Sequence, residues 1–271
     1  MAIHEQDIWA RIGEVLDPEL DRPLDTLGFV DQVEIQEGDV RVRLRLPTYW
    51  CAANFAYMMA ADLRDRIGAA PGVERVTVLV ADHFAGDEIS DGVNHGRPFS
   101  AVFPGDADGE LEELRHTFAV KAFLVRQEQM LRALLRAGLS TERVTCVTLG
   151  DLRLDGDDVL ARVAPLFARQ EGKEATAGGE QVWLRAPGLA RIYRLWRSRR
   201  ALLRLRETPD DAPCFTTADG AEISPDALPE HLRSARMVRL NGAFNTLLCT
   251  GLHAVRYGSG EQARELPGEL A

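Results

Sequence analysis

Two short segments that alternate between apolar and polar residues, with a turn between them, most strongly limit how this chain can fold. The segments are residues 29–36 (FVDQVEIQ) and 39–46 (DVRVRLRL), and they lie on either side of Glu37-Gly38. A period of two predicts strands, and a short connection that contains glycine predicts a β-hairpin. In the second segment the apolar residues alternate with three arginines. We therefore expect a sheet with one buried face and one face in solvent.

The elements around this hairpin predict a small α+β unit. Residues 3–16 carry apolar side chains at helical spacing, and Pro18 ends that helix because a proline disfavours the α region for the residue before it. Residues 50–68 predict a second helix and residues 73–80 a third strand. The order helix–strand–strand–helix–strand gives a compact α+β domain over residues 1–82.

The remainder of the chain predicts a mixed α/β, largely helical region, so the fold class is α+β. We expect four regions: the domain at 1–82, an acidic and glycine-rich loop at 83–109, a mixed helical domain at 110–258 and a polar tail at 259–271. Within the third region the patterns predict a long helix at 110–137, a strand at 143–149 and a helix at 157–170 that Pro165 interrupts.

Composition excludes several classes of function. The formal net charge of −10 makes the chain a poor general ligand for nucleic acid or for anionic membranes. No apolar run approaches the roughly 20 residues that a membrane-spanning helix requires, and the N-terminus lacks the pattern of a signal peptide. The four cysteines are scattered and form no C-x-x-C pair, so the sequence suggests neither a disulfide framework nor a zinc ribbon. These features predict a cytoplasmic protein.

The sequence also lacks the common motifs of metabolic enzymes. It has neither the phosphate loop G-x-x-x-x-G-K-[ST] nor the dinucleotide fingerprint G-x-G-x-x-G. The G-x-S-x-G elbow and the H-E-x-x-H motif are missing too. We therefore expect that the protein is not an enzyme that turns over a small metabolite.

Cys51 is the candidate with the most informative position. It follows a predicted buried strand and opens the predicted helix at 50–68, where free N–H groups and the helix dipole stabilise an anion. A thiol there is expected to ionise readily and to serve as a nucleophile or a metal ligand. Thr48 and Tyr49 precede it and are expected to cap the turn or to donate a hydrogen bond to the sulfur. The alternative is a small apolar side chain in the core.

The acidic turn Asp17-Pro18-Glu19 is a second candidate. Two carboxylates that flank a proline can help to bind a metal or to orient a partner. The alternative is a helix stop with two solvated acids.

Several motifs follow one another in a specific order. They are Asp17-Pro18-Glu19, Leu27-Gly28-Phe29-Val30, the hairpin, Thr48-x-x-Cys51 at a helix start, and Pro71-Gly72-Val73 before a strand. In order and spacing, residues 5–82 resemble the PaaD-like/SufT-like iron–sulfur assembly family. That family includes the small cytosolic subunit of the eukaryotic iron–sulfur targeting complex.

This resemblance implies a small α+β fold and a role in assembling iron–sulfur clusters or delivering them to apo-proteins. One branch of the family accompanies a di-iron oxygenase. By resemblance, Cys51 and Thr48 form the position that binds a cluster or iron, and Asp17 and Glu19 form the acidic turn. The family often has a proline after the cysteine, where this chain has Ala52. The loss of a preset φ need not change the role of the sulfur.

Two further groups contain metal-ligand residue types. Residues 82–95 hold two histidines and four acids, and imidazole with carboxylate is the ligand chemistry of non-haem iron. Of these, His83 is a candidate metal ligand, and a solvated acidic loop is the alternative. Cys249 and His253 lie one turn apart if their segment is helical, either as metal ligands or as a core cysteine near a surface histidine. The remaining cysteines, Cys146 and Cys214, are expected to be structural.

A basic segment from Trp183 to Arg206 carries eight arginines and no acid. Its apolar residues recur at helical spacing, and Arg191, Arg194 and Arg197 occupy the remaining surface. It can dock an acidic client protein, or nucleic acid, or pack on its own chain with its arginines paired to acids. The negative net charge disfavours nucleic acid.

These observations together favour a metal-centre maturation factor in which the Cys51 thiolate transiently holds iron or an iron–sulfur cluster. A transient ligand must also release its cargo, which suits one accessible thiolate completed by a second subunit or by a client. We expect a homodimer or a client complex, and family analogy suggests a component of a di-iron monooxygenase as client. A metal-free adaptor and a thiol enzyme that uses Cys51, with His83 as a nearby base, are the alternatives.

Overall fold

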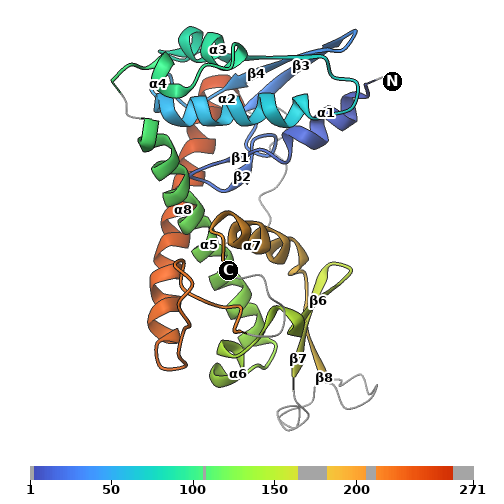
Figure 1. Cartoon of the computed structure of the whole chain (residues 1–271), viewed down its shortest axis with the longest axis vertical. Helices are drawn as coiled ribbons and strands as arrows, with labels where there is room; N and C mark the ends of the chain where they lie inside the picture. Colours follow the sequence, from blue (N-terminus) through green and yellow to red (C-terminus); the bar gives the residue numbers. More distant parts are fainter. Residues whose placement is uncertain (1–2, 106–107, 164–181, 206–211, 259–271) are drawn as a thin grey trace. The chain divides into compact units, whose positions relative to one another are not determined.

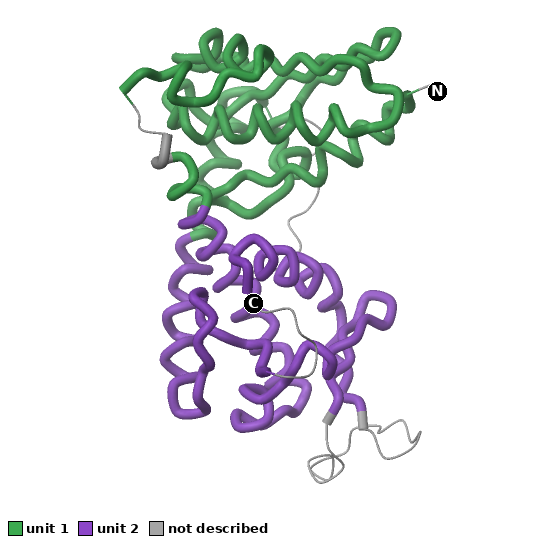
Figure 2. Tube along the Cα trace, viewed as in Figure 1, with its two compact units in different colours: residues 1–115, 242–271 green, residues 116–241 purple. Residues whose placement is uncertain are grey.

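The structure, a computed structural model, describes residues 3–105, 108–163, 182–205 and 212–258 of the chain. It divides into two compact units, residues 1–115 with 242–271 (unit 1) and residues 116–241 (unit 2), coloured separately in Figure 2. The two long helices α5 (Asp108–Arg136) and α8 (Leu228–Tyr257) contribute residues to both units. Helices and sheets occur in both, so the predicted α+β class is confirmed.

The predicted hairpin is confirmed and forms part of the sheet of unit 1. Strand β3 (Val30–Gln36) pairs antiparallel with β4 (Asp39–Arg45), and Gln36 lies opposite Asp39. Glu37 and Gly38 have φ of 47° and 97°, as in the two-residue hairpin turns whose twist matches that of the strands. Strand β5 (Arg75–Ala81) pairs in parallel with β4, which gives the order β3-β4-β5.

Helix α2 (Ala53–Gly68) connects the parallel strands β4 and β5 and packs against the sheet (Figure 1). Its buried side chains meet the alternate apolar residues of β4 in one core, as the alternation predicted. Helix α1 (Glu5–Ile12) packs on α2 and ends four residues before the predicted end at residue 16. The reason is that Leu16 and Asp17 form the short strand β1, which pairs with β2 (Arg22–Pro23).

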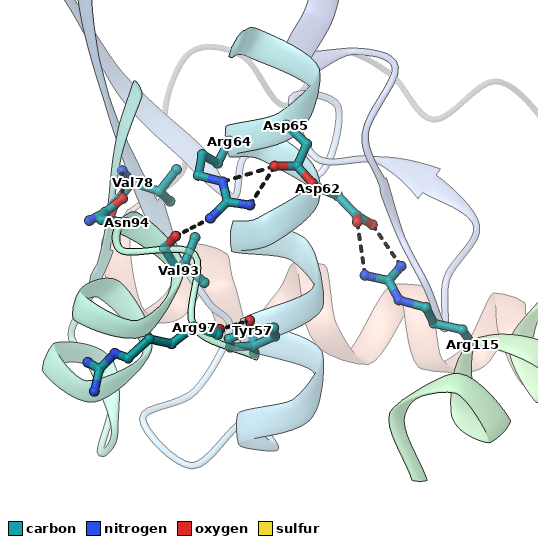
Figure 3. Close-up of polar contacts among 9 residues, drawn as sticks. All are labelled: Tyr57, Asp62, Arg64, Asp65, Val78, Val93, Asn94, Arg97 and Arg115. Atoms are coloured by element: carbon teal, nitrogen blue, oxygen red, sulfur yellow. Dashed lines mark hydrogen bonds and ion pairs between the residues drawn. The ribbon is translucent and has the colours of Figure 1, made fainter. Parts of the chain in front are cut away.

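The prediction of a loop at 83–109 was wrong, because this segment contains helices α3 (Gly86–Asn94) and α4 (Phe99–Val102). Side chains tie it to the preceding elements (Figure 3). Asn94 exchanges two hydrogen bonds of 2.9 Å with the backbone of Val78, and Arg64 of α2 donates to the carbonyl of Val93. Tyr57 of α2 donates to the carbonyl of Arg97. The helical state of this polar segment therefore depends on tertiary contacts rather than on its own propensity.

Part of unit 1 comes from the C-terminal part of the sequence. Residues 242–257, the C-terminal half of α8, group with the N-terminal domain. The first turns of α5 also belong to unit 1. There Arg115 makes a bidentate ion pair with Asp62, with N–O distances of 3.0 and 2.9 Å (Figure 3). The predicted regions 1–82 and 110–258 thus differ from the compact units of the fold. The predicted tail at 259–271 lies outside the described residues.

Unit 2 has its own core and its own three-stranded sheet. Its elements, in chain order, are the rest of α5, α6 (Thr141–Thr145), the 3₁₀ helix η1 (Leu149–Asp151), β6 (Leu152–Asp155), β7 (Asp158–Val163), β8 (Val182–Ala186), α7 (Ala190–Leu202) and the first half of α8. The strands are antiparallel in the order β6-β7-β8. The core gathers around the fully buried Trp196, Phe123 and Phe215.

Two predictions in unit 2 were wrong. The apolar segment 143–149 is no strand, because Ser140 caps helix α6 by accepting a hydrogen bond from the backbone N–H of Arg143 at 3.2 Å. The predicted helix at 157–170 begins instead as strand β7, which follows a turn at Gly156-Asp157. The predicted interruption at Pro165 lies outside the described residues. None of the helices that the structure describes is long and apolar enough to cross a membrane.

Candidate functional site

Cys51 lies at the junction between β4 and α2. The helix begins at Ala53 with Ala52 as its N-cap, so Cys51 precedes the first turn rather than opening it as predicted. The cap residue has no side chain that could bond the free N–H groups of the first turn. Cys51 packs against the core of unit 1 and stays partly exposed. A solute or a partner protein can therefore reach its neighbourhood, unlike that of a buried core cysteine.

Thr48 holds the sulfur, as the sequence predicted. Its hydroxyl oxygen lies 3.4 Å from the Sγ of Cys51, within hydrogen-bond distance for sulfur. The backbone N–H of Cys51 also donates to the carbonyl of Thr48 at 3.5 Å. This tight turn restricts where the sulfur points, which is what a ligand position requires.

His83 contacts the backbone of Cys51 rather than its sulfur. Its Nδ1 accepts a hydrogen bond from the N–H of Ala85 at 3.2 Å. The proton must then reside on Nε2, which donates to the carbonyl oxygen of Cys51 at 2.7 Å. Burial lowers the pKa of His83, and the charge of Arg256 lowers it further, although the bond to Cys51 opposes both.

Both ring nitrogens of His83 are therefore engaged by backbone groups. A general base for the Cys51 thiol needs a free ring nitrogen within reach of the sulfur, and so does a metal ligand. The geometry gives His83 a positioning role for the turn that carries Cys51. It does not favour the thiol-enzyme hypothesis, nor His83 as a metal ligand.

The acidic turn is built around a buried carboxyl group. Oδ1 of Asp17 accepts hydrogen bonds from the backbone N–H groups of Glu19 and Leu20 at 2.9 and 2.8 Å. This arrangement closes the turn between β1 and β2. Burial raises the pKa of Asp17 to about 6, against the two hydrogen bonds, and the charge of Glu19 adds to the rise. Asp17 thus has a defined structural role, which is to close this turn.

Glu19 connects the acidic turn to α8. Its Oε1 accepts a hydrogen bond from Nδ2 of Asn245 at 3.0 Å. One helical turn further along α8 comes Cys249, and the next turn carries His253. The prediction that Cys249 and His253 are one turn apart in a helix is confirmed.

Cys249 shares its surroundings with Cys51, which the sequence did not predict. Both side chains pack against the same core of unit 1, and both are partly exposed. The pKa of Cys249 is raised to about 11, mainly by burial and also by electrostatic interaction with Asp17, Glu19 and Cys51. The acidic turn and the two cysteines are therefore close enough to interact electrostatically. No signal in the sequence connects Cys51 to a residue near the other end of the chain.

His253 and Arg256 fix the end of α8 on the same domain. The ring of His253 lies 5.3 Å from that of Phe29, beside Gly28, whose φ of +73° explains the need for glycine in this motif. Arg256 donates to the carbonyl of Leu46 at 3.3 Å and to that of Asp82 at 2.6 Å. These contacts hold α8 against the segments on either side of Cys51.

The predicted metal-ligand residues at 82–95 are spread over helix α3 and the residues on either side of it. Asp91 pairs with His95 at 2.9 Å and with Arg97, and both side chains of the histidine pair are exposed. Across the part of the chain that the structure describes, no three histidine, cysteine, aspartate or glutamate side chains gather closely enough to hold a metal ion. The chain by itself therefore presents no closed metal site there.

Three exposed aromatic side chains lie beside Cys51. Trp50 is 75% exposed, and its ring stacks on Phe84 with 5.6 Å between centroids. Tyr49 packs edge-on to Trp50 at 4.9 Å, and the backbone of Phe84 bonds that of Tyr49. Aromatic side chains of this kind are enriched where proteins bind one another.

The predicted partner-binding arginines lie on α7 in unit 2. Arg191 and Arg194 are exposed. Arg197 is partly buried and donates to the hydroxyl of Tyr193 at 3.2 Å. Of the other two cysteines, Cys146 is exposed in unit 2, and Cys214 is buried there with a raised pKa caused by burial.

Comparisons with known proteins agree with the resemblance over part of the chain. Residues 5–80 match the model of the family described as iron-sulfur cluster assembly protein. No curated protein matches the chain. The matched segment contains the acidic turn, Thr48 and Cys51, and it ends before α3. Residues 5–80 are therefore similar to this iron–sulfur cluster assembly family, and the match covers less than half of the chain.

Proposed function

We propose that this protein is an accessory factor that assembles an iron–sulfur cluster, or delivers a cluster or iron, to a client protein. The match of residues 5–80 to the assembly family carries this proposal, because it includes Cys51 and the Thr48 that holds its sulfur. Thiolate sulfur is the usual protein ligand of iron–sulfur clusters. The cluster is a cargo here, held by Cys51 and then released.

The aromatic patch of Tyr49, Trp50 and Phe84 supports a protein as recipient. It adjoins Cys51, so a client docked on it would place its own ligands next to the sulfur. The resemblance to the PaaD-like/SufT-like branch makes the apo-form of a di-iron monooxygenase component the first client to test. Exposed Arg191 and Arg194 of unit 2 are the candidates for additional contacts with an acidic client.

Anaerobic reconstitution tests the proposal. Wild-type protein and the variants Cys51→Ala and Cys146→Ala are incubated with ferrous iron and sulfide, desalted, and analysed by absorption and iron counting. The Cys146 variant is the control, because this exposed thiol lies in unit 2, outside the matched domain. We expect chromophore and iron in the wild type and the control, and loss of both in Cys51→Ala.

Two other outcomes would change the conclusion. Iron in all three proteins would show that Cys51 is not the ligand. No iron in any of them would contradict cargo binding and favour a metal-free adaptor. The adaptor hypothesis then predicts that client capture survives Cys51→Ala but is lost in Trp50→Ser or Arg194→Ala.

A further inference from the structure

Helix α8 places a ladder of three side chains against the matched domain. Asn245, Cys249 and His253 are spaced by four residues, so they lie on one face of the helix, about 6 Å apart along its axis. The ladder is fixed at both ends, by the bond from Asn245 to Glu19 at 3.0 Å and by the contact of His253 with Phe29. Cys249 is held between the acidic turn and the glycine motif.

The exposed surface of this part of α8 is largely apolar. Its large side chains, each 41% or more exposed, are Phe244, Leu247, Leu248, Leu252 and Val255. The hydrogen bond of Asn245 to Glu19 and the ring contact of His253 with Phe29 define the rotation of α8 about its axis. The position of Cys249 therefore follows from specific contacts on both sides of it.

Two thiols from distant parts of the chain thus lie in the same unit and against the same core. Cys51 and Cys249 pack against one core, both stay partly exposed, and an electrostatic interaction with Cys51 contributes to the raised pKa of Cys249. Asp17 and Glu19 add negative charge at the same place. Two thiols with two carboxylates nearby favour a bound cation, which displaces the thiol proton when it coordinates sulfur.

We propose that Cys249 is a second thiolate ligand for the iron–sulfur cargo, so that this chain supplies two of the four ligands of a cluster through Cys51 and Cys249. The inference rests on the proposed function, since the nature of the cargo comes from there. Cys249 lies outside residues 5–80, so the family match does not assign it any role.

The remaining two ligands come from outside the chain, because no third histidine, cysteine or carboxylate joins a metal-binding group among the described residues. Thiolates are the ligands that a cluster prefers. They are supplied by glutathione or by a second copy of this chain. A half-open site of this kind lets an incoming client replace the external thiolates first, which suits a cargo that must be released.

The test compares Cys249→Ala and Cys249→Ser with wild type, Cys51→Ala and Cys146→Ala. All five are reconstituted anaerobically with ferrous iron, sulfide and glutathione, and then challenged with a ferrous chelator. Loss of an outer-shell partner already weakens metal binding by roughly 10-fold to 100-fold, so we expect both Cys249 variants to lose iron at least about 10-fold faster than wild type. Circular dichroism before loading confirms that the variants are folded.

A second readout needs no metal. Dibromobimane becomes fluorescent when two neighbouring thiols displace its two bromides. We expect a Cys51–Cys249 crosslink, identified by peptide mapping, in wild type and in Cys146→Ala, and none in the other variants. Absence of this crosslink in the folded wild-type protein would overturn the inference, because the two sulfurs would then not be neighbours.

The outcomes separate the inference from the proposed function. If Cys249 variants retain iron as wild type does while Cys51→Ala loses it, the inference is wrong and the proposed function stands. If wild type retains no iron, both are wrong. Native mass spectrometry of the loaded protein identifies the external ligands: added glutathione mass on one chain indicates glutathione, and one cluster on two chains indicates a homodimer.

Discussion

At the residue scale, Asp17 stabilises a turn through hydrogen bonds, but its burial makes its negative charge unfavourable. Its Oδ1 closes the turn between β1 and β2 through two backbone N–H groups. Its charge, however, is largely removed from water, and burial raises its pKa to about 6. In the proposed cargo site, this negative charge near Cys249 would attract a bound cation.

Asp17→Asn separates these two effects. Asparagine keeps the acceptor oxygen for the turn but carries no charge. Because the folded-state pKa lies above the usual 3.8, folded Asp17 binds more protons than unfolded Asp17 between about pH 4 and pH 6. Its contribution to stability is therefore greatest at low pH and falls as the pH rises through this window.

We thus expect Asp17→Asn to stabilise the protein relative to wild type, by at most about 3 kcal/mol above pH 6 and by much less at pH 4. Urea unfolding at pH 4 and pH 7.5 measures both differences. The histidines whose pKa is lowered, such as His83, titrate alike in both proteins and cancel from the comparison. An equal effect at both pH values would contradict a buried, titrating Asp17.

At the element scale, α3 shows how tertiary contacts select a helix. Gly86 begins this helix, and a Cβ there would lie 2.4 Å from the carbonyl oxygen of Val80, a backbone atom that cannot easily move. Ser90, one turn later, accepts a hydrogen bond from the N–H of Val80 at 2.9 Å. The helix can approach β5 this closely only because its first residue has no side chain.

Gly86→Ala and Gly251→Ala form a matched pair of helical substitutions. We expect Gly86→Ala to destabilise the protein by about 1–3 kcal/mol through overpacking against β5. Around Gly251 of α8 the space is open, so alanine there should be neutral or stabilise by up to about 1 kcal/mol. Urea denaturation midpoints measure both. A neutral Gly86→Ala would contradict the close packing of α3 on β5.

The sequence predicted those elements whose local pattern agrees with their tertiary setting. The hairpin and α2 have clear periodicity and turn residues, and Thr48 and Cys51 follow directly from them. Helix α3 was missed because its glycines and acids resemble a loop. Strand β7 was missed although Gly156-Asp157, between two segments that contain alternating apolar residues, is a hairpin turn signal.

The position of Cys249 was missed for a different reason. Cys249 packs against the same core as Cys51 only because α8 returns to unit 1, and periodicity along one segment contains no information about such a return. Sequence spacing placed Cys249 and His253 on one helix face, but it did not place that face against the acidic turn. The sequence left open whether His83 approaches Cys51 as a base, and its contact is with the carbonyl of Cys51, which only coordinates reveal.

At the scale of the whole molecule, two separate apolar cores are joined by two shared helices. Leu63 is fully buried in the core of unit 1, and Leu131 is fully buried in that of unit 2. The proposed cargo site belongs to unit 1 alone. Loss of packing in unit 2 should therefore leave it formed as long as the chain remains folded.

Leu63→Ala and Leu131→Ala test this division. Each should cost about 2–5 kcal/mol, the usual range for a buried leucine in a core. We expect hydrogen exchange followed by mass spectrometry to show loss of protection mainly in β4 and β5 for Leu63→Ala, and mainly in α7 and β7 for Leu131→Ala. Equal loss of protection in both units for either variant would show that they unfold as one.

The central claim, that the chain hands an iron–sulfur cargo to another protein through Cys51, is tested most directly by transfer. Reconstituted protein is mixed with the apo-form of a [2Fe–2S] ferredoxin in the presence of a chelator that captures free iron, and the ferredoxin spectrum is followed. We predict that wild type and Cys146→Ala convert the acceptor and that Cys51→Ala does not. Conversion at an equal rate by Cys51→Ala, or a loaded wild type that leaves the acceptor unchanged, would contradict the account.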